Sequence, residues 1–216
     1  MLTVYTAVFG VTDPLHESVV DTAARFVCFT DNRQLTSPRW EMVYHEPTDH
    51  PTRQARTVKA LSHRHTDTEW SLWMDANFAL KVDPLILLNR HELTTFVHPS
   101  RKTLAAEGLA VLEWGKAKPG MVKKQLDAYQ AEGFPLRHPP AGGLSCTGIV
   151  LRRHTARVCR FNETWQQQLD RYTLRDQLGV DYAAWKEGIT PFRWPGHCRA
   201  NPYFTHVTYD RPVNDF

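Results

Sequence analysis

An aspartate and an asparagine two residues apart interrupt an apolar run in the middle of the chain. The segment WSLWMDANFAL, beginning at Trp70, has the length and apolar content of an inner strand and breaks off at Asp75 and Asn77. Open α/β sheets bind ligands at the carboxyl ends of their strands, and oxygen ligands suit Mg²⁺ or Mn²⁺ that bridges to substrate phosphates. The pair therefore predicts a cation site. A plain turn is the alternative, because Asp and Asn are common turn residues.

Three cations precede this strand at threefold spacing. Arg53, Arg56 and Lys59 lie in residues 52–65, which predict a helix, so their side chains fall close to one face. Such a face could neutralise phosphates, with Arg in forked hydrogen bonds and Lys as a point charge. A solvated helix face is the alternative interpretation.

The ends of the first two predicted strands also carry candidate binding residues. Tyr5 and Thr6 with Phe9 belong to the first strand, and Asp31 follows the second. Phe9 or Tyr5 could pack against a nucleobase, and Asp31 could accept hydrogen bonds from a base or ribose, as acidic residues do in dinucleotide folds. Ordinary turns at strand ends are the alternative.

Acidic and imidazole groups late in the chain complete the set of candidates. Asp176 stands at a helix start, where an acidic residue either caps the helix or contributes to chemistry. His197 and His206 could return to complete a metal site, since imidazole binds Mn²⁺ although less well than carboxylate does. His98, after another strand, is a candidate for the pocket wall.

The surrounding elements alternate in the way that an α/β domain requires. We predict a mostly parallel central sheet flanked by helices, because strand-like and helix-like segments follow one another from the N-terminus onward. The predicted strands are 2–9, 25–29, 40–45, 70–80 up to its break, 94–98 and 147–152, with Gly148 opening the last. The predicted helices are 52–65, a short one that starts at 83–84, 103–114, 119–132, 155–172 and one after 175–177 with Leu178, Tyr182 and Trp185 buried. Residues from Thr190 onward predict irregular, extended chain.

Composition limits the class of protein. The 216 residues, of which 42% are hydrophobic and 23% charged, fit one globular domain over 1–216. A net charge of +3 suits a phosphate-bearing substrate but is far from a nucleic-acid signature. No run predicts a membrane span or a signal peptide, and the four scattered cysteines predict neither zinc nor disulfides, so a cytoplasmic setting is expected. Sequence motifs of serine hydrolases, P-loop kinases, Rossmann dehydrogenases and zincins are absent.

Taken in order, several blocks resemble a glycosyltransferase-like domain family found in plant mucilage-related proteins and in many bacteria. The blocks are YTAVFG at 5–10, FVCFTD at 26–31, R-Q-A-R-x-x-K at 53–59, LWMDANFAL at 72–80, FVHPSR at 96–101, TGIVLRRH at 147–154 and RDQL at 175–178. That family is similar to nucleotide-sugar transferases of the GT-A fold, in which a D-x-D motif after a central strand holds a divalent metal and the donor diphosphate. The resemblance therefore implies a single GT-A-like, Rossmann-like domain.

The same resemblance implies roles for individual residues. Asp75 and Asn77 take the D-x-D positions, Asn being the weaker ligand, and His206, in preference to His197, would complete the metal site. Asp176 matches a later acidic position that touches the acceptor or donor sugar and sometimes serves as base. The remaining assignments are Thr6 and Asp31 at the nucleoside, Arg56 and Lys59 at the diphosphate or ribose, and Gly148 facing the donor sugar.

The resulting hypothesis is a metal-dependent glycosyltransferase that uses Mn²⁺ or Mg²⁺. Its donor would be a nucleoside diphosphate sugar, expected to be UDP-linked, and its acceptor a hydroxyl of a glycan, a glycoconjugate or a hydroxylated nucleobase in DNA. A non-catalytic nucleotide-sugar-binding module is an alternative, because Asn77 replaces a second carboxylate. A hydrolase using Asp75 and Asp176 is another. The oligomeric state is left open.

Overall fold

A seven-stranded sheet forms the centre of the protein, as the alternating segments predict. The computed structural model describes residues 1–10 and 14–207. In this sheet β7 runs antiparallel to both of its neighbours, and the remaining strands share one direction. The spatial order is β3-β2-β1-β4-β7-β6-β8, with β1 at Leu2–Val8, β2 at Arg25–Thr30, β3 at Glu41–Tyr44, β4 at Trp70–Met74, β6 at Leu93–Val97, β7 at Ser145–Arg153 and β8 at Phe192–His197. The α/β class with a mostly parallel sheet is confirmed.

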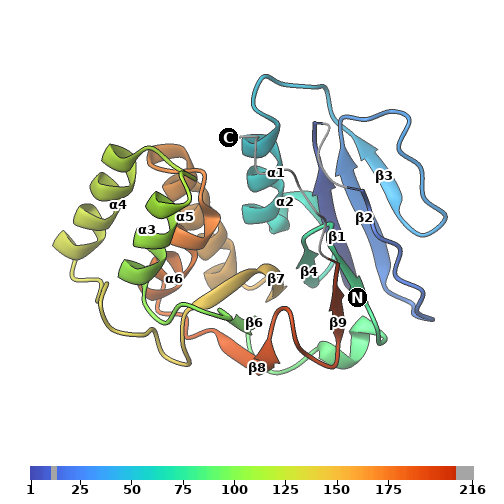
Figure 1. Ribbon diagram of the computed structural model, residues 1–216. Coiled ribbons are helices and arrows are strands. Elements are labelled where there is room, and N and C mark those ends of the chain that lie inside the picture. The colour runs from blue at the N-terminus through green and yellow to red at the C-terminus, as the bar shows by residue number, and fades with distance from the viewer. Residues whose placement is uncertain (11–13, 208–216) are drawn as a thin grey trace.

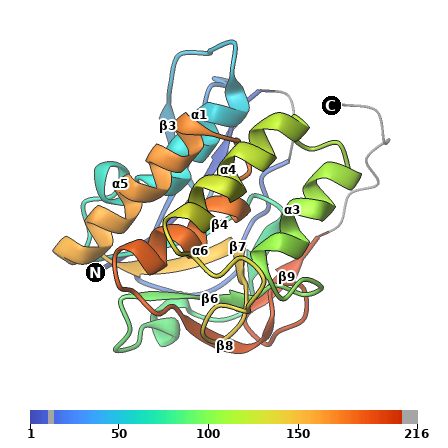
Figure 2. The same ribbon diagram turned by 90° about the vertical axis from the view of Figure 1, so that its left-hand side faces the viewer.

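Helices cover one face of this sheet. In Figure 2 the helices α1, α4, α5 and α6 lie in front of the central strands, and Figure 1 shows α3 to α6 grouped together away from β1 to β3. Their bounds are α1 Pro51–Ala60, α2 Ser62–His65, α3 Leu104–Glu113, α4 Pro119–Ala131, α5 Ala156–Arg171 and α6 Asp176–Lys186, with a short 3₁₀ helix at Pro84–Leu87. Thr103, Thr155 and Asp83 each accept a hydrogen bond from a backbone N–H in the first turn, which fixes where three of these helices begin.

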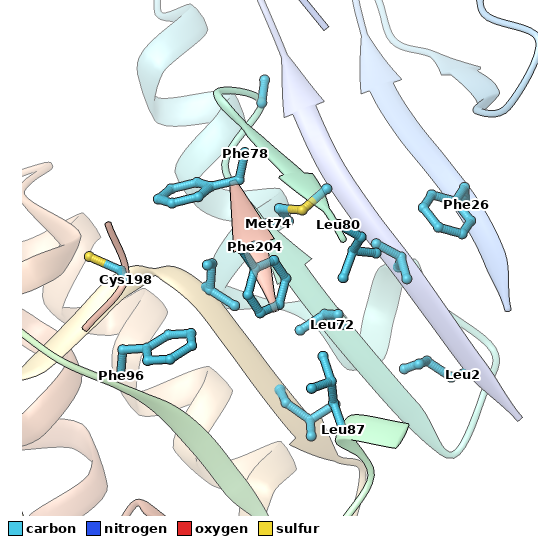
Figure 3. Packing of buried hydrophobic residues seen from close by; sticks show 14 of the residues in the cluster. Leu2, Phe26, Leu72, Met74, Phe78, Leu80, Leu87, Phe96, Cys198 and Phe204 are labelled. Carbon is cyan, nitrogen blue, oxygen red and sulfur yellow. The ribbon is translucent and has the colours of Figure 1, made fainter. Parts of the chain in front are cut away.

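Alternating side chains of the inner strands build two cores on opposite faces. On the helical face, Tyr5 and Trp73 pack with Phe161 and Trp165 of α5. On the opposite face the inner strands meet a small antiparallel sheet made of β5, Phe78–Leu80, and β9, Phe204–His206. Figure 3 shows Met74, Phe78, Leu80 and Phe204 gathered on this second face. Inner strands are covered on both sides, and every residue of β4 is accordingly buried.

The C-terminal segment is more regular than predicted. Residues from Thr190 onward were expected to be irregular, but β8 joins the edge of the central sheet beside β6, and β9 pairs with β5. β8 contains Pro195 and Gly196, which weaken a strand signal and are tolerated because this strand is at a sheet edge. The prediction for 190–207 is therefore wrong in these two stretches, and 208–216 lie outside the described residues.

Three smaller predictions also need correction. The helix predicted at 52–65 is interrupted at Leu61, whose ψ of 45° leaves the helical region, so α1 and α2 are separate. Gly148 lies inside β7, not at its start, because pairing with β6 extends the strand to Ser145. Trp185 is 42% exposed, since it lies in the last turn of α6, where the helix reaches the surface.

The strand order identifies where a ligand site belongs. The chain runs from β1 outward to β3 and then returns to place β4 on the other side of β1. Such a reversal leaves a crevice at the carboxyl ends of the two strands, where α/β proteins bind ligands. Asp75 directly follows β4 at this position. Among the described residues no helix is long and apolar enough to span a membrane.

Candidate functional site

Asp75 forms a turn and also presents a carboxylate oxygen to solvent. Its backbone N–H donates to the carbonyl of Gly148 at 2.9 Å, and its carbonyl accepts from the N–H of Phe78 at 3.0 Å. Carboxylate Oδ1 accepts from Trp73 Nε1 at 2.7 Å and from Lys59 Nζ at 3.1 Å. Oδ2 accepts no hydrogen bond from the described part of the chain, and the side chain is 36% exposed. The turn therefore serves to hold a carboxylate with one oxygen available.

Asn77 and His206 face each other across the small sheet. Phe78 pairs with His206 in the ladder between β5 and β9, and Asn77 Nδ2 lies 3.3 Å from His206 Nε2. Asn77 Oδ1 is buried without a hydrogen-bond partner, which costs free energy unless a ligand occupies it. Burial and the positive charge of Arg199 lower the pKa of His206, while the Asp75 carboxylate acts to raise it. The net lowering favours the neutral form of the imidazole, which is the form that binds metal.

These three side chains fit a divalent cation through oxygen and imidazole donors. The fit depends on Asn77, because no group of three or more His, Cys, Asp or Glu side chains within 1–10 and 14–207 is placed to hold a metal. The ring of His197 instead accepts a hydrogen bond from the N–H of Arg199, and His197 belongs to β8. His206 is thus the late histidine that contacts Asn77.

A buried ammonium connects Asp75 to the second candidate carboxylate. The Lys59 side chain is 1% exposed, and its Nζ lies 3.1 Å from Asp75 Oδ1 and 2.6 Å from Asp176 Oδ2. Arg56 Nη1 lies 3.2 Å from the same oxygen of Asp176. Burial acts to raise the pKa of Asp176, but the charges of Arg56, Lys59 and Arg175 outweigh it and hold that pKa well below its ordinary value. Asp176 is therefore an ionised anchor for the two cations.

The basic face of α1 is divided between two neighbours. Arg56 and Lys59 point toward Asp176, as just described, whereas Arg53 pairs with Asp170 of α5 at 3.0 Å, and both of these side chains are largely exposed. The threefold spacing thus brings two of the three cations to the crevice.

The predicted nucleoside residues offer different amounts of surface. Thr6 and Phe9 are 1% and 4% exposed, and the Phe9 ring lies edge-on against His45. Both carboxylate oxygens of Asp31 accept from the N–H of Gly10, at 3.0 and 3.1 Å. Asp31 therefore fixes the turn after β1, and the roles of Thr6, Phe9 and Asp31 at a nucleoside stay predictions.

Sequence reasoning missed Arg152, which holds the backbone of α1 at Lys59 through hydrogen bonds. The fully buried guanidinium donates to the carbonyls of Lys59 and Ala60, at 2.7 and 3.0 Å, and to Asn162 Oδ1 at 2.7 Å. Tyr5 also donates to the Lys59 carbonyl, at 3.0 Å. These bonds satisfy carbonyls in the last turn of α1. An arginine within the apolar run GIVLRR was the available signal.

Gly148 leaves space for the ring of Phe78 beside the Asp75 carboxylate. A Cβ at this position would lie 3.0 Å from Phe78 Cε2 and 3.5 Å from Asp75 Oδ2. We expect Gly148→Ala to cost about 1 kcal/mol of stability through overpacking and to weaken Mn²⁺ binding by displacing the Phe78 ring, which packs against His206. Urea unfolding and calorimetric titration of Mn²⁺ measure the two effects. Gly120→Ala is the control, because a Cβ there meets no atom within 4 Å. Unchanged Mn²⁺ affinity in Gly148→Ala would contradict the prediction.

Comparisons with known proteins identify the family of this chain. The chain matches the family described as "TOD1/MUCI70, glycosyltransferase-like domain" over residues 30–192. It is 28% identical over 158 residues to the "Probable hexosyltransferase MUCI70" of Arabidopsis thaliana, a match that covers 68% of this chain and 27% of that protein. It is 26% identical over 145 residues to the "Alkaline ceramidase TOD1" of the same plant, covering 62% of this chain and 31% of that protein. The chain thus matches less than a third of either relative's length. The family match includes β4, Asp75, Asn77 and Asp176, and this protein belongs to the TOD1/MUCI70 glycosyltransferase-like domain family.

Proposed function

We propose that this protein transfers a hexosyl group from a nucleoside diphosphate sugar, with UDP as the expected nucleotide, to a hydroxyl acceptor. The observation that carries the proposal is a set of oxygen and nitrogen atoms near the end of β4 that could bind a metal ion. Asp75 Oδ2, the buried Oδ1 of Asn77 and the ring of His206 lie near the end of β4, where α/β folds bind ligands. Membership of a glycosyltransferase-like family and the name of one relative, a probable hexosyltransferase, support the same reaction class.

Asp75, Asn77 and His206 would hold Mn²⁺ or Mg²⁺. A bound cation of this kind supplies positive charge that stabilises a leaving diphosphate. Lys59 contributes a fixed ammonium at the same place, because it is held between Asp75 and Asp176 and needs no rearrangement during the reaction. The chain's own part is therefore electrostatic stabilisation and orientation of the donor.

Asp176 fits a positioning role better than that of a general base. A base acting near neutral pH needs a pKa close to that range, whereas cations hold the pKa of Asp176 well below its ordinary value. Its oxygen Oδ2 is already taken by Lys59 and Arg56. We therefore assign Asp176 to orienting these two cations beside the donor.

A direct assay tests the reaction class. Purified protein is incubated with UDP-hexoses and a panel of glycan acceptors, with Mn²⁺ or Mg²⁺ and with chelator in place of metal. Metal-dependent transfer of the hexose to one of the acceptors supports the proposal. Ceramide is included as a substrate because one relative is named an alkaline ceramidase. Ceramide cleavage without any turnover of nucleotide sugars would overturn the proposal.

A non-catalytic binding module is a second candidate, favoured by Asn77 in place of a carboxylate. Calorimetry separates the two functions, since a module binds UDP-hexose with metal but releases no UDP with any acceptor. A hydroxylated DNA base is a further acceptor to test, and its binding would weaken steeply with added salt because phosphate contacts release counterions. Water as the acceptor, detected by free hexose alone, would indicate a hydrolase.

Restoring a carboxylate at position 77 is expected to strengthen the metal site. Asn77→Asp should tighten Mn²⁺ binding roughly tenfold, because cation affinity rises with the number of charged ligands. Without metal, the new carboxylate would be buried beside Asp75, so the melting temperature should fall and recover on adding Mn²⁺. Calorimetry and thermal unfolding with and without Mn²⁺ measure both effects, with Asn89→Asp, at a turn before β6, as the control. Equal or weaker Mn²⁺ affinity in Asn77→Asp would remove residue 77 from the ligand set.

A further inference from the structure

A group of cations lies beside the candidate site without enough carboxylates to balance it. We name it the cation cluster and define it as Arg101, Lys116, Arg175 and Arg199. Arg101 and Lys116 both make cation–π contacts with Trp114. The guanidinium carbon of Arg101 and the ammonium nitrogen of Lys116 lie 4.9 and 4.4 Å from the centre of this ring. Trp114 follows α3 and is 52% exposed, so this part of the cluster is open to solvent.

Glu107 is the acidic side chain that pairs with Arg101 of the cluster. Its positive neighbours also include Arg175 and Lys116. Within 1–10 and 14–207, neither Lys116 nor Arg175 makes a side-chain hydrogen bond or ion pair, and Arg175 Nε is buried without a partner. Burial lowers the pKa of Lys116, and the positive charges of Arg175, Arg101 and Arg199 lower it further. The carboxylate of Glu107 acts in the opposite direction and raises this pKa. Cations held this close repel one another unless an anion joins them.

The cluster adjoins the proposed donor site. Arg175 directly precedes Asp176, and the carboxylates of Asp176 and Asp75 both act on its pKa, which burial lowers. Another member of the cluster, Arg199, lowers the pKa of His206 through its positive charge. The cluster thus begins beside the donor and metal residues and extends past them to the exposed ring of Trp114 at the end of α3.

We propose that the cation cluster binds an anionic group, a carboxylate or a phosphate, on the acceptor. This inference rests on the proposed transferase function. A bound carboxylate or phosphate would supply the hydrogen-bond acceptors that Lys116 and Arg175 lack, with Arg well suited to its forked geometry. The exposed part of Trp114, which is 52% exposed, would contact a sugar ring next to that group. The acceptor is therefore an acidic glycan or a phosphorylated glycoconjugate.

Matched acceptors test the proposal and separate the two anions. One pair is a hexuronate oligosaccharide and the same chain with its carboxyls reduced to alcohols, and the other is a sugar phosphate and its dephosphorylated form. Binding of each is measured by calorimetry with UDP and Mn²⁺ present, and transfer is measured with a UDP-hexose. We expect the anionic member of at least one pair to bind about tenfold more tightly, as one charge-assisted hydrogen bond provides.

Lys116→Met is the deciding variant, because it keeps the length of the side chain and removes its charge. It should abolish most of the preference for the anionic acceptor. Lys124→Met, an exposed lysine of α4 outside the cluster, should retain the preference. Thermal unfolding shows whether each variant is folded, and Arg199→Gln repeats the test at the other end of the cluster.

The remaining outcomes distinguish this proposal from the proposed function. Equal binding of charged and neutral acceptors, or binding of neither, overturns the cluster's role, even where transfer from UDP-hexose occurs. Weaker UDP binding by Lys116→Met, with no change in acceptor preference, also overturns it and assigns the cluster to the donor diphosphate. Anionic acceptors that bind through Lys116 without any turnover of nucleotide sugars support the cluster and overturn the transferase.

Discussion

Replacing Asp75 by asparagine is expected to lower the rate of donor turnover by roughly 10²–10³-fold. The variant keeps an oxygen that can accept from Trp73 and Lys59, so the turn after β4 is retained. It removes the carboxylate charge that acts on His206, and with it the strongest proposed ligand for the metal. Charge stabilisation by a metal contributes several kcal/mol, and each 1.36 kcal/mol corresponds to about a tenfold change in rate.

The measurement is release of UDP from a UDP-hexose at saturating Mn²⁺, with the affinity for Mn²⁺ determined by calorimetry. Asp127→Asn is the matched control, because Asp127 is an exposed acidic residue of α4 that pairs with Lys123. The control should retain full activity. An Asp75→Asn protein that is folded, binds Mn²⁺ as the wild type does and turns over at the wild-type rate would show that Asp75 has only a turn-forming role.

The position of Asp75 at a strand end can be predicted from the sequence. The contacts that complete the site cannot. The abrupt end of the Trp70 strand is a local pattern, so both the turn and its position at a strand end follow from neighbouring residues. The pairing of Asn77 with His206 joins residues 129 positions apart, and it depends on two three-residue strands. Strands this short give no periodicity to detect.

Long-range charge pairs were equally hidden. The spacing of Arg56 and Lys59 predicts that they share a helix face, but not that Asp176, more than a hundred residues later, neutralises both. Arg152 is hidden for a related reason: its partners are backbone carbonyls, which have no residue signature in a sequence. The charge of a side chain follows from its residue type, whereas its ion-pair partner is determined by the tertiary structure.

The second large predicted effect is a loss of stability on removing the buried ammonium of Lys59, which pairs with Asp75 and Asp176. Lys59→Met is expected to destabilise the protein by about 3 kcal/mol, toward the lower end of the range for breaking a buried ion pair, because Arg56 still pairs with Asp176. Urea unfolding measures the change, and Lys124→Met, an exposed lysine of α4, is the control with an expected change near zero. A change below about 1 kcal/mol in Lys59→Met would mean that the network contributes no more than a surface pair.

A double-mutant cycle and its pH dependence identify the source of this effect. Lys59→Met combined with Asp176→Asn should destabilise the protein less than the sum of the two changes, because the second removes the carboxylate that the first leaves underpaired. The folded pKa of Asp176 is depressed, so its stabilisation is complete above its unfolded pKa of about 3.9 and declines as the pH falls below that value toward the folded pKa. The stability difference between wild type and Asp176→Asn should accordingly be constant from pH 5 to 7 and shrink in acid. A difference that grew in acid, or strict additivity in the cycle, would show that Asp176 is not the ionised partner of Lys59.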